Sequence, residues 1–155
     1  MKVVDANVLL YAVNEEAEHH EVAKAWLDAA LSGPESVALP WICLLAFIRL
    51  STHASLFEHP LRVDDALDIV DAWLRAPQVL TADADRRHSG RLRHLLAATG
   101  AGGNLTNDAH LAALALQYDA TVATFDHDFG RFPGVRWIRP SASTDDRHRP
   151  SQPPS

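Results

Sequence analysis

The stretch VVDANVLL, residues 3–10, decides the fold, because it opens with a β-branched run that leads directly into an acid. Two valines followed by Asp5 predict a short buried strand with a carboxylate at its carboxyl end. We interpret the whole stretch as a first buried strand that runs into a turn. In an open parallel α/β sheet, functional groups gather at the carboxyl ends of the strands. Asp5 is therefore the first candidate for a functional side chain.

The remainder of the chain alternates patterns typical of helices and strands. Apolar residues recur at helical spacing in segments that predict helices over residues 18–33, 41–57, 64–76, 86–98 and 107–119. Short apolar or β-branched runs predict strands over residues 36–40, 78–83, 121–125 and 134–138. The residues expected to face the core from the third of these helices are Leu67, Val70, Trp73 and Leu74. Thr106 is expected to cap the last helix.

This alternation predicts a three-layer α/β/α sandwich with a mainly parallel central sheet. With 155 residues, the chain is long enough to bury a core as a single domain, which we expect to span residues 1–140. Residues 141–155 are rich in Ser, Pro and charged side chains and lack an apolar anchor, so we expect a disordered tail there. The single cysteine, Cys43, lies in the apolar run WICLLAFI and predicts a buried thiol instead of a disulfide framework.

Charge and hydropathy narrow the function classes. No apolar run reaches the roughly 18 residues that a membrane span needs, and an acid already in the first strand argues against a secretory leader, so we expect a cytoplasmic location without a membrane partner. The net charge of −6 and the isoelectric point near 5.8 argue against a protein that coats nucleic acid non-specifically. An enzyme acting on nucleic acid stays open, because a bound cation can neutralise phosphate locally.

The segment RRHSGRLRH, residues 86–94, departs from this acidic average. It contains no acid and four arginines, which are Arg86, Arg87, Arg91 and Arg93. One interpretation is a solvated helix face. The other is a patch that contacts the phosphates of a nucleic acid. The sequence leaves both open.

Four aspartates from three separate segments carry the candidate chemistry: Asp5, Asp108, Asp126 and Asp128. Each has a simpler explanation when taken alone. Asp5 could be a buried acid held by backbone amides, Asp108 an acid that interacts with a helix dipole, and the other two could be turn residues. Together they are harder to dismiss, since the alternating topology brings strand ends and helix starts to one edge of the sheet. Carboxylates gathered there repel one another unless a cation joins them, so the pattern predicts a divalent metal site.

The segments that hold these aspartates resemble a known family. VVDANVLL, NDAHLAALAL and ATFDHDFGRF, together with the helix and loop FIRLSTHASLF, resemble the signature blocks of PIN-domain ribonucleases. More narrowly, they resemble VapC toxins of bacterial type II toxin–antitoxin modules. The blocks agree in order and spacing, and the resemblance covers about residues 1–140. It implies a metal-dependent endoribonuclease that cleaves phosphodiester bonds with a water activated by Mg²⁺, or by Mn²⁺.

The resemblance also implies a role for each acid. Asp5 matches the first metal-binding acid, and Asp108 matches the acid that shares the ion with it. Asp126 matches the third acid of the cluster, and Asp128 matches an accessory acid two residues later. We therefore expect all four to be catalytic and the first two to hold the metal.

Three further positions qualify this match. Asn7 matches a small polar residue beside the first acid, and Thr124 stands where the family often has a hydroxyl close to the carboxylates. Family members often have a glutamate three residues before Arg49, and this chain has Ala46 there. The acid cluster therefore lacks one of its usual members. Either the remaining aspartates hold one ion well enough for activity, or catalysis is weakened.

The resemblance implies partners as well. These are a VapB-like antitoxin that crosses the active-site groove, a second copy in a homodimer, and single-stranded regions of a structured RNA such as tRNA or rRNA. The surface for the antitoxin would come from the early helices, where Trp26 and the WICLLAFI run are candidates. The alternative for that run is ordinary core packing.

Two other interpretations remain. One is a degenerate PIN domain that binds RNA or antitoxin without efficient cleavage, because it lacks the acid at Ala46. The other is a phosphotransfer enzyme of the haloacid dehalogenase kind, which also opens with a strand and an aspartate. That chemistry needs a second Asp where this chain has Asn7, and a downstream Lys, whereas Lys2 and Lys24 are the only lysines.

Overall fold

The structure is a computed structural model that describes residues 1–100 and 102–142. At its centre lies a sheet of five strands in the order β3-β2-β1-β4-β5, in which every pair of neighbours is parallel. The strands are β1 (Lys2–Val4), β2 (Val37–Ala38), β3 (Val79–Leu80), β4 (Thr121–Ala123) and β5 (Arg136–Ile138). The predicted parallel sheet is confirmed.

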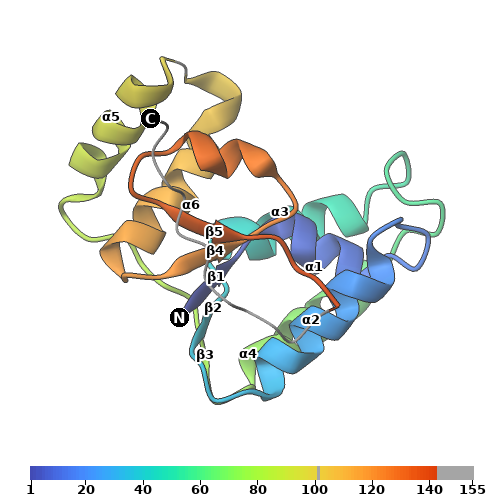
Figure 1. Ribbon diagram of the computed structural model, residues 1–155. Coiled ribbons are helices and arrows are strands. Elements are labelled where there is room, and N and C mark those ends of the chain that lie inside the picture. Colours follow the sequence, from blue (N-terminus) through green and yellow to red (C-terminus); the bar gives the residue numbers. More distant parts are fainter. Residues whose placement is uncertain (101, 143–155) are drawn as a thin grey trace.

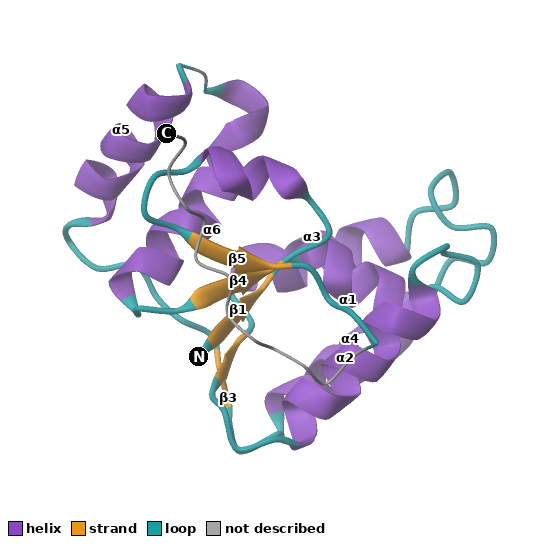
Figure 2. Cartoon of the chain, in the orientation of Figure 1, coloured by secondary structure: helices purple, strands orange, loops and turns teal. Residues whose placement is uncertain are grey.

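Helices cover both faces of this sheet. They are α1 (Ala6–Val13), α2 (His20–Ser32), α3 (Trp41–Ser51), α4 (Val63–Leu74), α5 (His88–Thr99) and α6 (Thr106–Gln117), with the short 3₁₀ helices η1 (Gly103–Leu105) and η2 (His127–Arg131). Figure 1 shows α5 and α6 on one side of the sheet and α1, α2 and α4 on the other. The strands form the thin middle layer in Figure 2, which confirms the three-layer α/β/α sandwich. Within the described residues, no helix combines the length and hydrophobicity that crossing a membrane requires.

The stretch at residues 3–10 is only half a strand, so the interpretation of the whole stretch as a strand is wrong. The strand β1 ends at Val4, and α1 begins at Ala6. Asp5 favours the start of α1 directly after β1, because its Oδ1 accepts a hydrogen bond of 2.7 Å from the N–H of Ala6 and so caps that helix. A continuous apolar run does not distinguish a buried strand from a buried helix, because both faces of either element are apolar.

Three smaller expectations also need correction. The helix predicted over residues 41–57 ends at Ser51 and gives way to turns. Leu67 does not face the core, since 41% of it is exposed, and Ala66 is the fully buried residue in that turn of α4. Thr106 is the first residue of α6 and makes no cap, because the preceding 3₁₀ helix leads directly into α6 through Leu105.

The core lies between the sheet and the helices and is built from the strands and the inward faces of α1, α3 and α6. Phe47 and Phe129 are its largest fully buried side chains, and the ring of Phe47 packs against Trp73 of α4 at a centroid distance of 4.8 Å. Cys43 is buried with a free thiol, as predicted. Ser141 and Ala142 are exposed, and the remainder of the predicted tail, 143–155, lies outside the described residues.

Candidate active site

The parallel pairing of β1 and β4 brings Asp5 beside Thr124 in the ATFDHDFGRF segment. Val4 is in register with Ala123, and the N–H of Asp5 donates to the carbonyl of Ala123 at 3.0 Å. The residues that follow the two strands, Asp5 and Thr124, therefore lie side by side at the carboxyl edge of the sheet. Positions 119 residues apart in the sequence become neighbours through strand register alone.

Asp5 is buried and held by a network of polar groups. Its Oδ2 accepts hydrogen bonds from the hydroxyl of Thr124 at 2.8 Å and from Nδ2 of Asn7 at 3.1 Å. Burial raises the pKa of Asp5, the hydrogen bonds from Thr124 and Ala6 oppose that effect, and the charge of Asp126 adds to it. Both positions predicted to flank the first acid, Asn7 and Thr124, thus contact it directly.

Asp108 lies in the first turn of α6, which packs against β1 and β4. Burial, followed by the charges of Asp5, Asp126 and Asp128, raises the pKa of Asp108 to about 6. All three other candidate acids are therefore close enough to act on this carboxyl electrostatically. Like charges that raise one another's pKa are stabilised by a divalent cation, whose preferred ligands are carboxylate oxygens. These acids therefore offer a divalent ion the ligand type that it prefers; Asp5 is buried, and Asp108 and Asp126 are half-buried.

Asp126 and Asp128 occupy the turn that leads from β4 into η2. The N–H of Asp126 donates to the hydroxyl of Thr124 at 3.0 Å, and Oδ1 of Asp126 accepts the N–H of Asp128 at 2.8 Å. Asp126 is half-buried, whereas Asp128 and His127 are exposed. One carboxylate oxygen of Asp126 is therefore engaged in capping η2, and its other oxygen remains for ligand or water.

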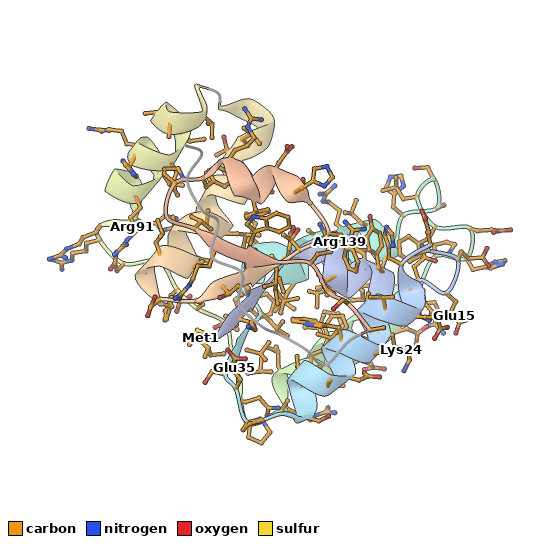
Figure 3. All side chains as sticks on the ribbon, in the orientation of Figure 1. Met1, Glu15, Lys24, Glu35, Arg91 and Arg139 are labelled. Carbon is orange, nitrogen blue, oxygen red and sulfur yellow. The ribbon has the colours of Figure 1, made fainter. Side chains whose placement is uncertain are left out.

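A cluster of side chains that the sequence did not single out holds this turn in place. The N–H of Phe125 donates to Oδ1 of Asn7 at 3.1 Å, and its carbonyl accepts Nη1 of Arg139 at 3.0 Å. The ring of His19 stacks on Phe125 with centroids 4.9 Å apart, and the guanidinium of Arg139 lies 5.1 Å from the same ring. Figure 3 shows Arg139 near the middle of the molecule. His19, the residue before α2, therefore packs on the turn that follows β4.

A cavity of about 600 Å³ opens beside Asp5 and Asp108. Its wall on the far side comes from α3, including Ala46, the position at which family members often have a glutamate. Cys43 also lines the cavity; burial above all raises the pKa of its thiol, and the charges of Asp5 and Asp108 raise it further. The helix α3 contributes no carboxylate to this wall.

The predicted arginine patch lies on α5 and at its start. Arg91 pairs with Asp85 at 2.6 Å and approaches Gln117 at the end of α6, whereas Arg86, Arg87 and Arg93 are exposed. Asp108 lies at the opposite end of α6, about 14 Å away along the helix. Figure 3 places Arg91 at the edge of the molecule. The start of α5 lies nearer to the site, because the rings of His88 and His110 are 2.8 Å apart at their nitrogens and His110 follows Asp108 by two residues.

A second group of metal-binding residue types lies elsewhere. Ligand atoms of Glu16, Glu58 and His59 come within 4.8 Å of one another, at the meeting point of two exposed loops. The hydrogen bond and the charge of Glu58 raise the pKa of Glu16. Exposed acids gather in this way without an ion, and none of the three lines the cavity beside Asp5.

We predict that Thr124→Val weakens both the fold and the site. Thr124 is fully buried, and its hydroxyl bonds to Asp5, Asn7 and the N–H of Asp126. Valine has nearly the same shape but leaves these groups unpaired, at a cost of about 1–3 kcal/mol in the free energy of unfolding. Urea denaturation measures that cost, and Thr121→Val, at the half-exposed start of the same strand, is the control.

Thr124→Val also removes a hydrogen bond that lowers the pKa of Asp5. We therefore expect the acid limb of any activity profile to move to higher pH in this variant. An unchanged profile together with unchanged urea stability would contradict the assigned role of the hydroxyl.

Comparison with known proteins places this geometry in a family. The family model described as "PIN domain" matches residues 2–135. The chain is 51% identical over 142 residues to "Ribonuclease VapC37" of Mycobacterium tuberculosis, a match that covers 92% of this chain and 99% of that relative. It is 36% identical over 140 residues to "Ribonuclease VapC33" of the same species, covering 90% and 98%.

Solved structures share the fold at lower identity. VapBC2 from Rickettsia felis, solved with a promoter DNA fragment, aligns with a TM-score of 0.64 and 19% identity over 89% of this chain and 97% of that one. FitAcB from Neisseria gonorrhoeae aligns with a TM-score of 0.59 and 24% identity over 90% and 98%. The family match and the identity to the mycobacterial relatives show that this chain belongs to the PIN-domain family and, within it, to the VapC group.

Proposed function

We propose that the protein is the ribonuclease toxin of a type II toxin–antitoxin module and that it cleaves RNA internally with the help of Mg²⁺. The observation that carries the proposal is the group of acids at the carboxyl edge of the sheet, where the hydroxyl of Thr124 binds both the carboxylate of Asp5 and the N–H of Asp126. Burial and, after it, the charges of Asp5, Asp126 and Asp128 raise the pKa of the half-buried Asp108 to about 6, which agrees with this grouping. The relatives named ribonucleases support the reaction class. Mn²⁺ is the expected substitute ion, because it accepts the same oxygen ligands.

Asp5 and Asp108 are the residues that would hold the ion. When bound, the cation supplies a Lewis acid that neutralises phosphate charge and favours ionisation of water. Side chains of the protein would position the metal-binding carboxylate and the attacking water. Thr124 and Asn7 keep the carboxylate of Asp5 in one orientation through hydrogen bonds of 2.8 and 3.1 Å. The carboxylate of Asp126, whose backbone N–H donates to Thr124, would orient the attacking water and accept its proton.

Asp128 is assigned an accessory part. It is exposed, and its charge contributes to the raised pKa of Asp108. In this arrangement it would act on water or substrate at the mouth of the site. The expected products have a 5′-phosphate and a 3′-hydroxyl, as the resemblance implies.

The substrate we propose is a single-stranded region of a structured RNA, with tRNA and rRNA as the leading classes. Unstacked strands present their bases and phosphates separately, so one phosphate can enter an acidic cleft with a cation without a paired strand beside it. Arg86, Arg87 and Arg93 would bind other phosphates of the strand, since their side chains are exposed. Arg91 would contribute only after leaving its ion pair with Asp85.

A VapB-like antitoxin is the proposed regulatory partner. The structural neighbours include complexes titled VapBC from several bacteria, which supports a paired arrangement. An arginine of the antitoxin would pair well with the clustered aspartates, because charge-assisted hydrogen bonds to carboxylates are strong. We also propose a homodimer and a cytoplasmic location.

One observation favours a second candidate function. The wall of the cavity at Ala46 lacks the glutamate that family members often have, so fewer carboxylates face the ion. A degenerate PIN domain that binds RNA or antitoxin without efficient cleavage would follow if the remaining acids held the cation too weakly.

Removal of the metal tests the proposal. Purified protein incubated with total bacterial RNA in Mg²⁺ is expected to produce discrete new 5′-phosphate ends, because a divalent ion is required to neutralise the scissile phosphate. Chelation with EDTA should abolish those ends, and readdition of Mg²⁺ or Mn²⁺ should restore them. Binding of RNA without cleavage in either ion would select the degenerate alternative.

A further inference from the structure

We propose that the cavity of about 600 Å³ beside Asp5 and Asp108 binds one nucleobase of the RNA strand, next to the phosphate that is cut. The inference rests on the proposed ribonuclease function and names a specificity pocket for it. The volume lies within the range of about 300–1,000 Å³ that is typical of small-molecule pockets. It exceeds what a phosphate and a cation alone would fill.

The walls of the cavity suit the flat faces of a base. Ile42, Leu45 and Ile48 line it from α3, and Leu111 lines it from α6. Between them lie Ala46 and Ala6, whose single methyl groups leave the space open. An aromatic ring placed there would exchange water for apolar side chains on both faces, which is the favourable part of base binding outside a stack.

Two polar side chains at the same cavity can bind the edge of the base. Asn107 and Arg49 line it, both are exposed, and within the described part of the chain no hydrogen bond or ion pair joins either side chain to another residue. An asparagine amide offers donors and an acceptor at once, which matches the mixed edge of a nucleobase. The guanidinium of Arg49 can stack on a base or donate to its oxygens.

The walls of the cavity favour a base over the other parts of a nucleotide. Asp5 and Asp108 line it, so a second phosphate there would meet two carboxylates, opposed only by the guanidinium of Arg49. The apolar wall of α3 would also fail to hydrate a phosphate or a ribose. A neutral base satisfies both walls, and its own phosphate would then lie toward the aspartates.

The test uses RNA oligonucleotides that carry one abasic nucleotide at a defined position on either side of the mapped cleavage site. Wild-type protein should cleave the intact oligonucleotide and lose at least about tenfold in kcat/KM for one abasic position only. Ala46→Leu, which fills the cavity, should lower kcat/KM for intact RNA and remove the penalty at that position. Ala72→Leu, on the exposed face of α4, is the matched control and should behave as wild type.

A second variant covers the case in which Ala46→Leu fails to fold, as judged by its thermal unfolding midpoint. Asn107→Ala, at an exposed position, should reduce the preference among the four bases at the sensitive position without filling the cavity. Cleavage by wild type with no abasic-sensitive position would overturn the base pocket and leave the ribonuclease function intact. An abasic penalty unchanged by either cavity variant would overturn it too. Absence of any cleavage by wild type would overturn both.

Discussion

Asp5→Asn is expected to lower RNA cleavage by at least about 100-fold, the scale seen when one group that stabilises charge in a transition state is removed. The asparagine keeps the size of the side chain and the acceptor for the N–H of Ala6, but it removes the charge that would hold the cation. Its amide also replaces an acceptor with a donor facing Nδ2 of Asn7. Burial already raises the pKa of Asp5, so a neutral side chain should be tolerated by the fold.

Sequencing of RNA ends after expression of wild type and Asp5→Asn measures this effect in cells. Distinct ends should appear with wild type and be absent with the variant, and growth inhibition should follow the same pattern. Asp68→Asn makes the same chemical change on the exposed face of α4 and should leave the cleavage profile unchanged. Identical profiles for wild type and Asp5→Asn would contradict the ribonuclease assignment.

Asp108→Asn is expected to have opposite effects on activity and on stability. Cleavage should again fall by at least about 100-fold, because the second cation ligand is lost. In EDTA at neutral pH, however, the variant should unfold at a higher urea concentration than wild type. The reason is that its amide carries no charge, so it avoids the cost of burying a carboxylate and, after that, the repulsion by Asp5, Asp126 and Asp128; these causes together raise the pKa of Asp108 to about 6.

The difference in unfolding free energy between Asp108→Asn and wild type should depend on pH. The folded protein holds the Asp108 proton more tightly than the unfolded chain, whose ordinary value is 3.8, so wild-type stability falls as pH rises from about 4 to about 6. The advantage of Asp108→Asn should therefore grow across that window and become constant above it. Adding Mg²⁺ should stabilise wild type and affect the variant much less, by linkage of binding to folding. A variant that is less stable than wild type in EDTA would show that Asp108 has a structural partner.

The local hydrophobic pattern of the sequence predicted most of the strands and helices of the fold. The β-branched runs that precede Asp5 and Asp126 became adjacent parallel strands, and the predicted helices between them were found with shifted ends. These elements were predictable because hydrophobic spacing records which face is buried. The half of residues 3–10 that forms α1 was not predictable, because an apolar run without period fits either element and only the cap by Asp5 decides it.

The local sequence pattern did not predict contacts between distant segments. The ring of His19 stacks on Phe125, which lies more than 100 positions later in the sequence. The hydrogen bond from Arg139 to the carbonyl of Phe125 joins the segments that follow β5 and β4. Leu67 illustrates the same limit, since its spacing suits the core but 41% of it stays exposed among the described residues. Helical period predicts that a face is apolar, whereas burial requires something to lie against it.

The sequence by itself determined the order of the elements, the identity of the four aspartates and the absence of an acid at Ala46. Only the tertiary structure decided that Asp5 accepts hydrogen bonds from Asn7 and Thr124. It also decided that Ala46 lines a largely apolar cavity beside the carboxylates of Asp5 and Asp108. The physical reason is that residue type and spacing follow from the chain alone. Burial, register and charge interaction depend on which strands pair and which helices pack, and these are long-range outcomes of folding.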